Sequence, residues 1–451
     1  MVTQIKRLVI IGCAGAGGPA AMMAKRLDSS LEVTLIREEE NFLVRCAVPY
    51  ICAGDCTVES SVKDESVFHN VGTKLVNSRA TDIDRAHKTV TVEDGSVYSY
   101  DKLVLATGAS PSLPPIPGID LDGVFTVRTS RDAQCINEWI AGNSVRKAMV
   151  IGAGAIGLEI AALLSTKGIG TVVVEMLDHV FPSALDVDMA AEVEEYLRGQ
   201  GLDLRLQQRI SRITGDNKVA GVELSSGEKI EAETVILAGG IKPRLELAEA
   251  AGLEVGKLGL KVNKYLQTSD QDIYAAGDMI EFESMSTGKP VLGQLRPNAV
   301  IGGRVIAMNA LGYQIEFPKL VNTFATKLMD LSLGATGITE EFALQEGMEI
   351  VCAKRSARSK HAMIEGGKPF TVKLIFDRKS QTIVGGQIVG YSEVLAKQID
   401  VLGTAIKGGM TALDLTTLRC AGQPELSPEP GAEPISLAAG DAFLELTPRP
   451  S

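Results

Sequence analysis

Apolar positions along the chain repeat one arrangement twice. Residues 7–12 form a short apolar run that leads into a glycine-rich turn and then into an Ala- and Met-rich stretch, and residues 147–152 begin the same series. A further apolar run follows each series, at residues 33–36 and 171–174. A strand, a turn, a helix and a second strand make a βαβ unit. The pattern therefore predicts an α/β fold with two βαβ units, and so two dinucleotide sites.

A different pattern begins near residue 321. Strands are predicted at residues 321–327, 334–338, 370–377 and 382–389, with a helix over Ser392–Lys407, which together indicate a separate α+β domain. Residues 110–118 are rich in proline and predict a connector. The tail from Gly422, rich in Pro, Glu and Gly, predicts little regular structure. At about 150 residues per domain, the chain of 451 residues suits about three domains.

Composition excludes several classes of protein. The chain has 45 basic and 56 acidic residues, a net charge of −11, which argues against a nucleic-acid binder. No apolar run reaches about 18 residues, so we expect no membrane insertion. The seven cysteines are an odd number in a long chain, which favours free thiols in a reducing cytoplasm. Cys46, Cys52 and Cys56 have no common metal-ligand spacing, and we expect no metal.

The first glycine turn departs from the strict dinucleotide motif. Gly12 and Gly17 occupy its first and third positions, Ala14 replaces the middle glycine, and Gly15 keeps the loop lean. The helix that follows offers free N–H groups to a phosphate. A ribose-binding acid is expected about 20 residues further on, and we place it at Glu38. Glu38 equally suits a solvated charge run with its two neighbours.

The second glycine turn carries the motif unbroken. Gly152, Gly154 and Gly157 stand at the required positions, with Ile156 inside the turn, and Glu175 closes the next strand. A carboxylate there accepts from both ribose hydroxyls and repels a 2′-phosphate. The motif therefore predicts an NAD(H) site that favours NADH over NADPH.

Further motifs show a family resemblance. They are Cys46-Ala-Val-Pro-Tyr50, Tyr100–Gly108, the second glycine turn through Glu159, Thr268–Asp278 and Ile399–Met410. With these motifs the chain resembles the flavoprotein pyridine nucleotide-disulfide oxidoreductases over nearly its whole length. It is most similar to their single-cysteine branch, which holds coenzyme A-disulfide reductases, NADH oxidases and peroxidases, and persulfide or polysulfide reductases.

The resemblance implies an organisation and a set of cofactor contacts. An FAD domain would span residues 1–112 and 243–320, an NAD(H) domain 113–242, and a homodimer-forming domain 321–451. Asp278, after Gly277, would bond the FAD ribitol, and Thr107 and Gly108 would pass near the flavin. Gly240 and Arg45 would also be cofactor-binding residues. Thr-Gly and Gly-Asp pairs also make ordinary turns, although the motifs in register favour the functional interpretation of Asp278.

Cys46 is the candidate catalytic thiol. Pro49 suits the first turn of a helix, which places Cys46 at or just before the helix N-terminus. The helix dipole there stabilises a thiolate, and Arg45 adds positive charge. A free cysteine is more commonly a small buried hydrophobe, but here motif, helix position and charge agree on a redox role.

Several positions depart from the family's pattern. Gly15 stands where peroxidases and oxidases carry a histidine, which favours a sulfur substrate over peroxide or oxygen. Ala155 replaces an aromatic residue over the flavin, whereas Glu159 is retained and would orient the nicotinamide. Cys420 lies where relatives supply a tyrosine across the dimer, so it would act as a resolving cysteine for the partner or simply pack as a thiol. The tyrosine's absence weakens the case for coenzyme A as substrate.

The sequence thus predicts an FAD-dependent enzyme that uses NAD(P)H to reduce a low-molecular-weight disulfide, persulfide or polysulfide through Cys46. One alternative is an NADH oxidase. Another is an electron-transfer subunit that docks a redox protein.

Overall fold

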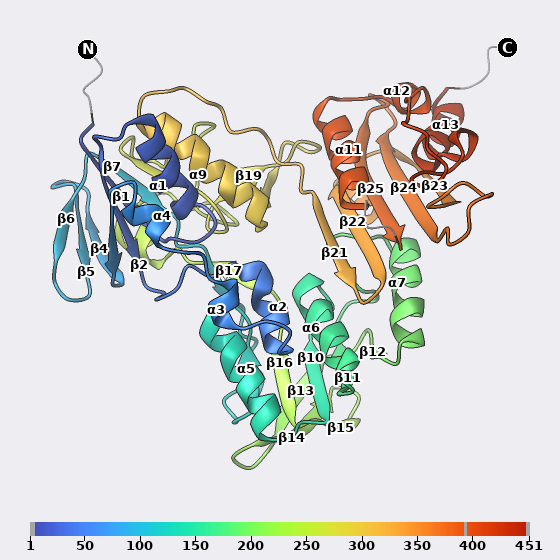
Figure 1. Ribbon diagram of the computed structural model, residues 1–451, viewed down its shortest axis with the longest axis horizontal. Coiled ribbons are helices and arrows are strands. Elements are labelled where there is room, and N and C mark those ends of the chain that lie inside the picture. The colour runs from blue at the N-terminus through green and yellow to red at the C-terminus, as the bar shows by residue number, and fades with distance from the viewer. Residues whose placement is uncertain (1–4, 392–394, 448–451) are drawn as a thin grey trace.

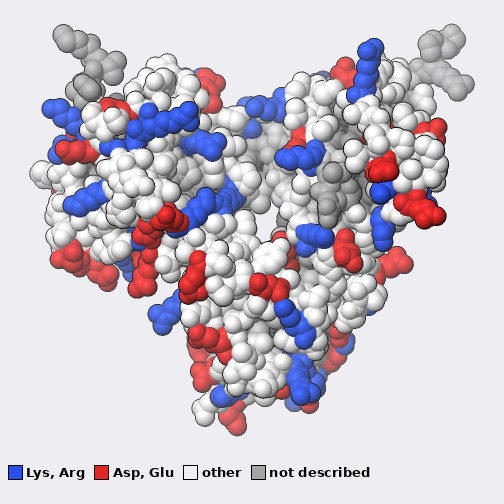
Figure 2. Space-filling view, viewed as in Figure 1, with Lys and Arg blue, Asp and Glu red and all other residues white. Residues whose placement is uncertain are grey.

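The computed structural model describes residues 5–391 and 395–447, which form three lobes around a central hollow (Figures 1 and 2). The first lobe holds a parallel sheet in the order β18-β7-β1-β2-β3. Its strands are β1 (Arg7–Ile11), β2 (Glu32–Arg37), β3 (Thr73–Asn77), β7 (Lys102–Leu105) and β18 (Ile273–Ala275). The last strand comes from far along the chain, so this lobe is built from two separate segments.

Helices and small sheets complete the first lobe. Glycine lets α1 and α9 pack closely, since a Cβ on Gly303 would lie 2.1 Å from the carbonyl oxygen of Ala16. The helices of this lobe are α1 (Gly17–Leu27), α4 (Ser66–His69), α8 (Glu246–Ala250) and α9 (Arg296–Ala310). Three short helices that follow β2 lie against the second lobe instead: η1 (Arg45–Ala47), α2 (Val48–Cys52) and α3 (Val58–Ser61). The small sheets use β4 (Ala80–Asp84), β5 (Thr89–Val92), β6 (Val97–Ser99), β19 (Glu281–Glu283) and β20 (Pro290–Leu292).

The second lobe repeats the architecture with a parallel sheet in the order β12-β11-β10-β16-β9. Its strands are β9 (Val124–Thr126), β10 (Lys147–Ile151), β11 (Gly170–Val174), β12 (Asp203–Arg205) and β16 (Thr234–Leu237). Its helices are α5 (Ser130–Gly142), α6 (Ala155–Thr166) and α7 (Val187–Gly199), and β13 (Ile210–Gly215), β14 (Val219–Leu224) and β15 (Lys229–Glu231) form a side sheet.

Two chain crossings join the first two lobes. β8 (Ala109–Pro111) pairs antiparallel with β17 (Ile241–Pro243), so the start of the expected Pro-rich connector is a short strand. The first and second lobes therefore share a two-stranded link beside the hollow.

The third lobe is an antiparallel sheet in the order β21-β22-β25-β24-β23, covered by helices. Its strands are β21 (Phe324–Leu328), β22 (Leu331–Gly337), β23 (Ile350–Arg358), β24 (Pro369–Asp377) and β25 (Ile383–Gly390). Its helices are α10 (Glu340–Gln345), α11 (Leu395–Lys407), α12 (Ala412–Thr416), η2 (Pro430–Ala432) and α13 (Pro434–Leu446). Residues 392–394 of the helix predicted over Ser392–Lys407 lie outside the described residues. The α/β class with an added α+β lobe is confirmed.

The expectation of an irregular tail was wrong. Helix α13 packs on β23 and β24 and buries Ile435, Ala438, Ala439, Ala442 and Leu446. These positions follow the spacing of one helix face. The Pro, Glu and Gly content of the segment before residue 434 concealed that short pattern.

Candidate functional site

Both glycine turns have backbones that only glycine can adopt without strain. Gly12 and Gly152 have φ of +101° and +106°, and a Cβ on either would collide with the backbone of the neighbouring strand-end loop. A Cβ on Gly17 or Gly157 would lie 1.7 Å or 2.1 Å from the carbonyl oxygen of the turn's first glycine. These contacts bring each helix against its strand, as a pyrophosphate site requires.

The interiors of the two turns are open to different degrees. Gly154 caps α6 with nothing within 4 Å of a Cβ, whereas a Cβ on Gly15 would lie 2.9 Å from the Cβ of Ala299. Ala14 is half-buried, and Ile156 is 38% exposed on the first turn of α6. The second turn therefore has more room around its middle glycine than the first has around Gly15.

Glu175 is held at the edge of the second sheet. It is 8% exposed, and its carboxylate accepts from the backbone N–H of Ala153 at 2.8 Å and of Leu177 at 2.9 Å. A carboxylate has about four lone-pair sites, so two remain for ribose hydroxyls. The residues present fit NAD(H).

The equivalent position in the first sheet holds Arg37. The amide of Gly12 donates to Ile36, and the amide of Gly152 donates to Val174, each at 2.8 Å, so Arg37 and Glu175 occupy matching places. Arg37 is buried, with its guanidinium bonded to Asn77 at 2.7 Å and 2.6 Å from the Glu65 carboxylate.

Glu38 lies one residue beyond this matching place. Its exposed side chain pairs with Arg244 at 3.1 Å. The ribose contact predicted for Glu38 therefore depends on a carboxylate displaced by one residue from the place that Glu175 holds.

The remaining predicted cofactor residues gather beside the first turn. Gly108 and Gly277 have positive φ, as does Gly240 at the start of the second crossing. The Thr107 hydroxyl donates to the carbonyl oxygen of Arg244 at 3.0 Å. Asp278 lies at the end of β18, where parallel strands present ligand-binding groups. These features fit FAD.

Arg128 is a residue of this site that the sequence analysis missed. Its guanidinium pairs with Asp278 at 2.6 Å, with both side chains mostly buried, and lies near Gly108. The capping Asp132 accepts from the backbone N–H of Arg128, fixing it at the start of α5. A lone arginine between two elements has no sequence signature, because its partner is 150 residues away.

Cys46 lies in η1, immediately before α2, as Pro49 predicted. Its side chain is exposed, while the apolar residues of α2 face the core of the second lobe. Arg45 does not stand free beside it, because its guanidinium donates to the carbonyl oxygen of Arg128 at 2.6 Å and pairs with Glu39. The positive charge expected from Arg45 is thus largely neutralised.

The other thiols differ from Cys46. Burial raises the pKa of Cys13, Cys52 and Cys352 to about 12. Cys56 is half-buried and accepts from the Ser61 hydroxyl at 3.3 Å. Cys420 is an exposed residue beyond α12. The pKa of its thiol is raised mainly by partial burial of the sulfur and, to a smaller extent, by the charge of Glu433.

Cys420 also lies apart from Cys46 in the chain's own fold. Helices α12 and α13 are at the outer end of the third lobe, away from α2 (Figure 1). A role toward Cys46 would therefore need a second subunit, and it stays a prediction.

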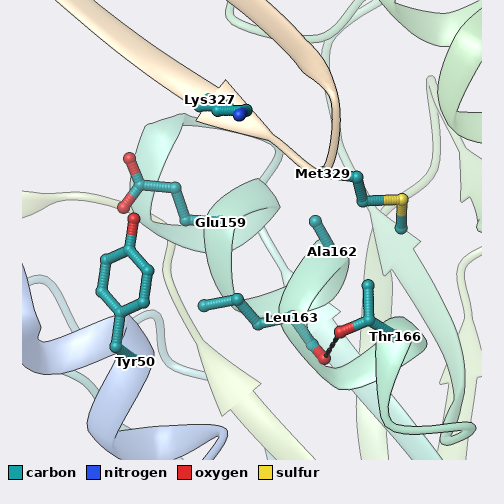
Figure 3. Close-up of a pocket in the computed structure, with 7 residues that line it drawn as sticks. All are labelled: Tyr50, Glu159, Ala162, Leu163, Thr166, Lys327 and Met329. Carbon is teal, nitrogen blue, oxygen red and sulfur yellow. Dashed lines mark hydrogen bonds between the residues drawn. The ribbon is translucent and has the colours of Figure 1, made fainter. Parts of the chain in front are cut away.

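Glu159 lines a small cavity where three elements meet. The cavity is enclosed by Tyr50 of α2, residues of α6, and Lys327 and Met329 at the end of β21 (Figure 3). The Thr326 hydroxyl donates to Glu159 at 2.5 Å. Burial raises the pKa of Glu159, and this hydrogen bond opposes the rise only in part. Glu159 therefore retains a proton to higher pH than an ordinary glutamate.

A buried ionic network ties the second lobe to the third. Lys373 of β24 is 5% exposed and lies 2.7–3.0 Å from carboxylate oxygens of Asp186, Asp188 and Glu340. Gln387 also donates to Asp186 at 2.7 Å. The network fixes α7 against the sheet, and hence the second lobe against β21.

Across residues 5–391 and 395–447, no three or more His, Cys, Asp or Glu side chains are grouped to hold a metal ion. Over the same ranges, none of the helices combines the length and apolarity needed to cross a bilayer. On the face shown in Figure 2, basic and acidic side chains are interspersed.

The chain is similar to known proteins over nearly its whole length. The chain is 36% identical to an NADH oxidase of Methanocaldococcus jannaschii, covering 98% of this chain and 99% of that protein. It is 35% identical to a CoA-dependent NAD(P)H sulfur oxidoreductase of Pyrococcus furiosus, covering 94% and 96%. The structure of an NAD-dependent persulfide reductase from A. fulgidus superposes with a TM-score of 0.92 at 35% identity, covering 97% of this chain and 83% of that one.

Two family matches agree with these relatives. Residues 6–310 match the pyridine nucleotide-disulphide oxidoreductase family, and residues 323–433 match its dimerisation domain. With two glycine turns shaped for dinucleotides and an exposed cysteine beside them, the chain belongs to the pyridine nucleotide-disulphide oxidoreductases, a family of flavin-dependent NAD(P)H oxidoreductases.

Proposed function

We propose that the protein uses FAD and NADH to reduce a low-molecular-weight disulfide, persulfide or polysulfide through Cys46. The observation that carries the proposal is the placement of Cys46, an exposed thiol in the turn before α2, whose neighbour Arg45 bonds Arg128, the ion-pair partner of Asp278. Burial instead raises the pKa of Cys13, Cys52 and Cys352 to about 12. The sulfur-reducing activities named for two relatives support this substrate class.

Each part of the site has its own task in this proposal. Bound FAD would carry two electrons from the nicotinamide to sulfur. The glycine turns would hold the pyrophosphates, Glu175 would accept from the ribose of NADH, and Asp278 would bond the ribitol of FAD. The thiolate of Cys46 attacks one sulfur of the substrate's S–S bond, which breaks; Cys46 keeps that sulfur as a mixed disulfide or persulfide, and the other sulfur leaves as a thiolate. Glu159, on the second lobe, would orient the nicotinamide.

The preference for NADH and the assembly are parts of the same proposal. Glu175 lies buried where a 2′-phosphate would have to fit, and two like charges at that distance repel. The match of residues 323–433 to a dimerisation domain supports a homodimer. All seven cysteines are free thiols, which supports a reducing cytoplasm as the location.

Substitution of Cys46 tests the proposal. Cys46→Ser should abolish NADH-dependent turnover of small disulfides and polysulfide while leaving reduction of the bound flavin by NADH intact. Cys420→Ser is the matched control, and an unchanged rate for it would also count against a resolving role. Undiminished sulfur turnover by Cys46→Ser would show that the mechanism is wrong.

A second candidate is an NADH oxidase, favoured by the name of the relative with 36% identity. Gly15 speaks against it, because the family's oxygen-reducing members carry a histidine there. Oxygen consumption at saturating NADH, compared with sulfur turnover by the same preparation, separates the two activities. The electron-transfer role with a redox-protein partner stays a prediction, and a stable co-purifying protein would support it.

A further inference from the structure

We propose that Tyr50, backed by Glu159, is the acid that protonates the sulfur leaving group when the Cys46 thiolate attacks a small disulfide or persulfide. This inference rests on the proposed function and adds a proton donor to it. The reaction needs one, because the thiolate expelled from the substrate must take up a proton before it leaves as a thiol.

Tyr50 lies on the same side of its segment as Cys46. The two residues are four positions apart across η1 and α2, the spacing that stacks side chains on one helical face. Both are exposed, and the Tyr50 side chain is 44% exposed, while Pro49, Ile51 and Cys52 point into the core. Both side chains are therefore on the exposed side of this short segment, and Cys46 is close enough for its charge to contribute to the raised pKa of Tyr50.

The phenol of Tyr50 points away from its own helix toward Glu159. Figure 3 shows the hydroxyl group and the carboxyl group facing each other across the small cavity between α2 and α6. The two groups are not hydrogen-bonded to each other, so a proton would pass between them through a water molecule in the cavity. The Thr326 hydroxyl donates to the carboxyl group of Glu159 and so restricts its position.

The charges around the pair suit a proton relay. Burial, followed by the charges of Glu159, Asp55, Cys46 and Cys56, raises the pKa of Tyr50, so the phenol stays protonated. Lys327 faces the cavity from β21, and Lys167 pairs with Asp55. Burial raises the pKa of Glu159, so this carboxyl group keeps its proton to a higher pH than an ordinary glutamate does.

The pair is needed because neither group suffices by itself. An ordinary tyrosine has a pKa of about 10 and an ordinary thiol about 8.5, so a phenol alone is a weaker acid than the thiol it must form. Glu159 is a stronger acid than that thiol, and a proton passed from Glu159 through Tyr50 runs downhill. No histidine lines the cavity that could act as the acid in place of this pair; the histidines of the chain are His69, His87, His179 and His361.

The step balances in atoms and charge. The bond between the two substrate sulfurs breaks, a bond from Cys46 to one sulfur forms, and the other sulfur leaves as a thiolate. That thiolate takes the phenol proton, Tyr50 takes the proton of Glu159, and Glu159 is reprotonated by solvent. Two electrons from NADH then release the second thiol, giving disulfide plus NADH plus a proton to two thiols plus NAD⁺.

Leaving-group dependence tests the inference. Tyr50→Phe and Glu159→Gln are compared with wild type on two substrates: hydroxyethyl disulfide, whose alkyl thiol needs a proton, and Ellman's reagent, whose aromatic thiolate leaves unprotonated. Tyr50→Phe should lower kcat/KM for the alkyl disulfide about 100-fold and for Ellman's reagent less than about 3-fold. In wild type, activity with the alkyl disulfide should fall as the pH rises and Glu159 loses its proton. Glu159→Gln should no longer show this pH-dependent fall.

The control is Tyr313→Phe, which makes the same change at a tyrosine that is 52% exposed after α9 and should behave as wild type on both substrates. An equal fall of Tyr50→Phe on both substrates would mean a structural role and overturn the inference, as would an unchanged rate on both. If wild type reduces neither of these disulfides nor polysulfide, the proposed function itself is wrong and the inference falls with it.

Discussion

Glu175→Gln is expected to weaken the choice of NADH over NADPH. In the structure two of the four lone-pair sites of this carboxylate are taken by the backbone N–H groups of Ala153 and Leu177. The other two are free for the ribose hydroxyls. A glutamine of the same size loses the charge, and its NH₂ group has to face either a backbone N–H or a ribose hydroxyl.

The magnitude follows from this count of lone pairs. A hydrogen bond to a charged group contributes about 1.5–3 kcal/mol, so losing one bond from the ribose to the carboxylate lowers kcat/KM for NADH by about 10- to 150-fold. The rate with NADPH should not fall in parallel, because removal of the negative charge also relieves its repulsion of the 2′-phosphate. The ratio of the two kcat/KM values should therefore drop at least about tenfold.

The assay is flavin reduction by each nucleotide in stopped flow, without a sulfur acceptor, which isolates the nucleotide site from Cys46. Glu231→Gln serves as control, since it removes the same charge from an exposed position of β15 on the same lobe. An unchanged NADH to NADPH ratio in Glu175→Gln, or an equal change in Glu231→Gln, would refute the assignment of Glu175 to the ribose.

Three further outcomes follow from other contacts. Lys373→Met should destabilise the protein by about 3 kcal/mol, because it leaves the buried carboxylate of Asp186 without its cation, whereas Lys397→Met, which removes an exposed ion pair, should change thermal unfolding little. Burial is the largest single influence on the pKa of Asp188 and raises it, but Lys373 and Lys354 together outweigh burial and lower this pKa, so the difference between Lys373→Met and wild type should be full above about pH 4 and shrink as the pH falls. Arg128→Met should weaken FAD binding by the apoprotein about tenfold or more, measured by flavin fluorescence, since it removes a charged hydrogen bond that positions its partner carboxylate. Deletion of the chain from residue 434 should expose the apolar surface under α13 and cause aggregation, measured by light scattering.

The two βαβ units could be predicted because their signals are local. A run of apolar residues, a glycine that must take a positive φ, and a helix N-terminus all lie within about 12 residues of one another. Glu175 was predictable for the same reason, since a strand end is readable from where the apolar run stops. Cys46 was placed correctly at the start of α2 because Pro49 marks a first helical turn.

The prediction of an irregular tail was wrong because composition was given more weight than periodicity, and the ribose contact of Glu38 stays a prediction because it depends on register. The Pro- and Gly-rich segment before residue 434 hid the apolar face of α13. In the first unit, the amide of Gly12 bonds to Ile36, and this places Arg37, not Glu38, at the position matching Glu175. A shift of one residue reverses the direction of a side chain in a strand, and the apolar pattern of residues 33–36 could not resolve it.

The sequence by itself determined the class of fold, the two dinucleotide turns and the candidate thiol, because each depends on backbone sterics and burial within a short segment. The tertiary structure decided that Arg128 reaches Asp278, that Arg45 is bound to Glu39, and that Tyr50, Glu159 and Thr326 meet around one cavity. These residues are separated along the chain, and their contacts depend on how helices and sheets pack against each other. Packing angles and loop paths carry no periodic signal, so only the folded chain shows which side chains share a site.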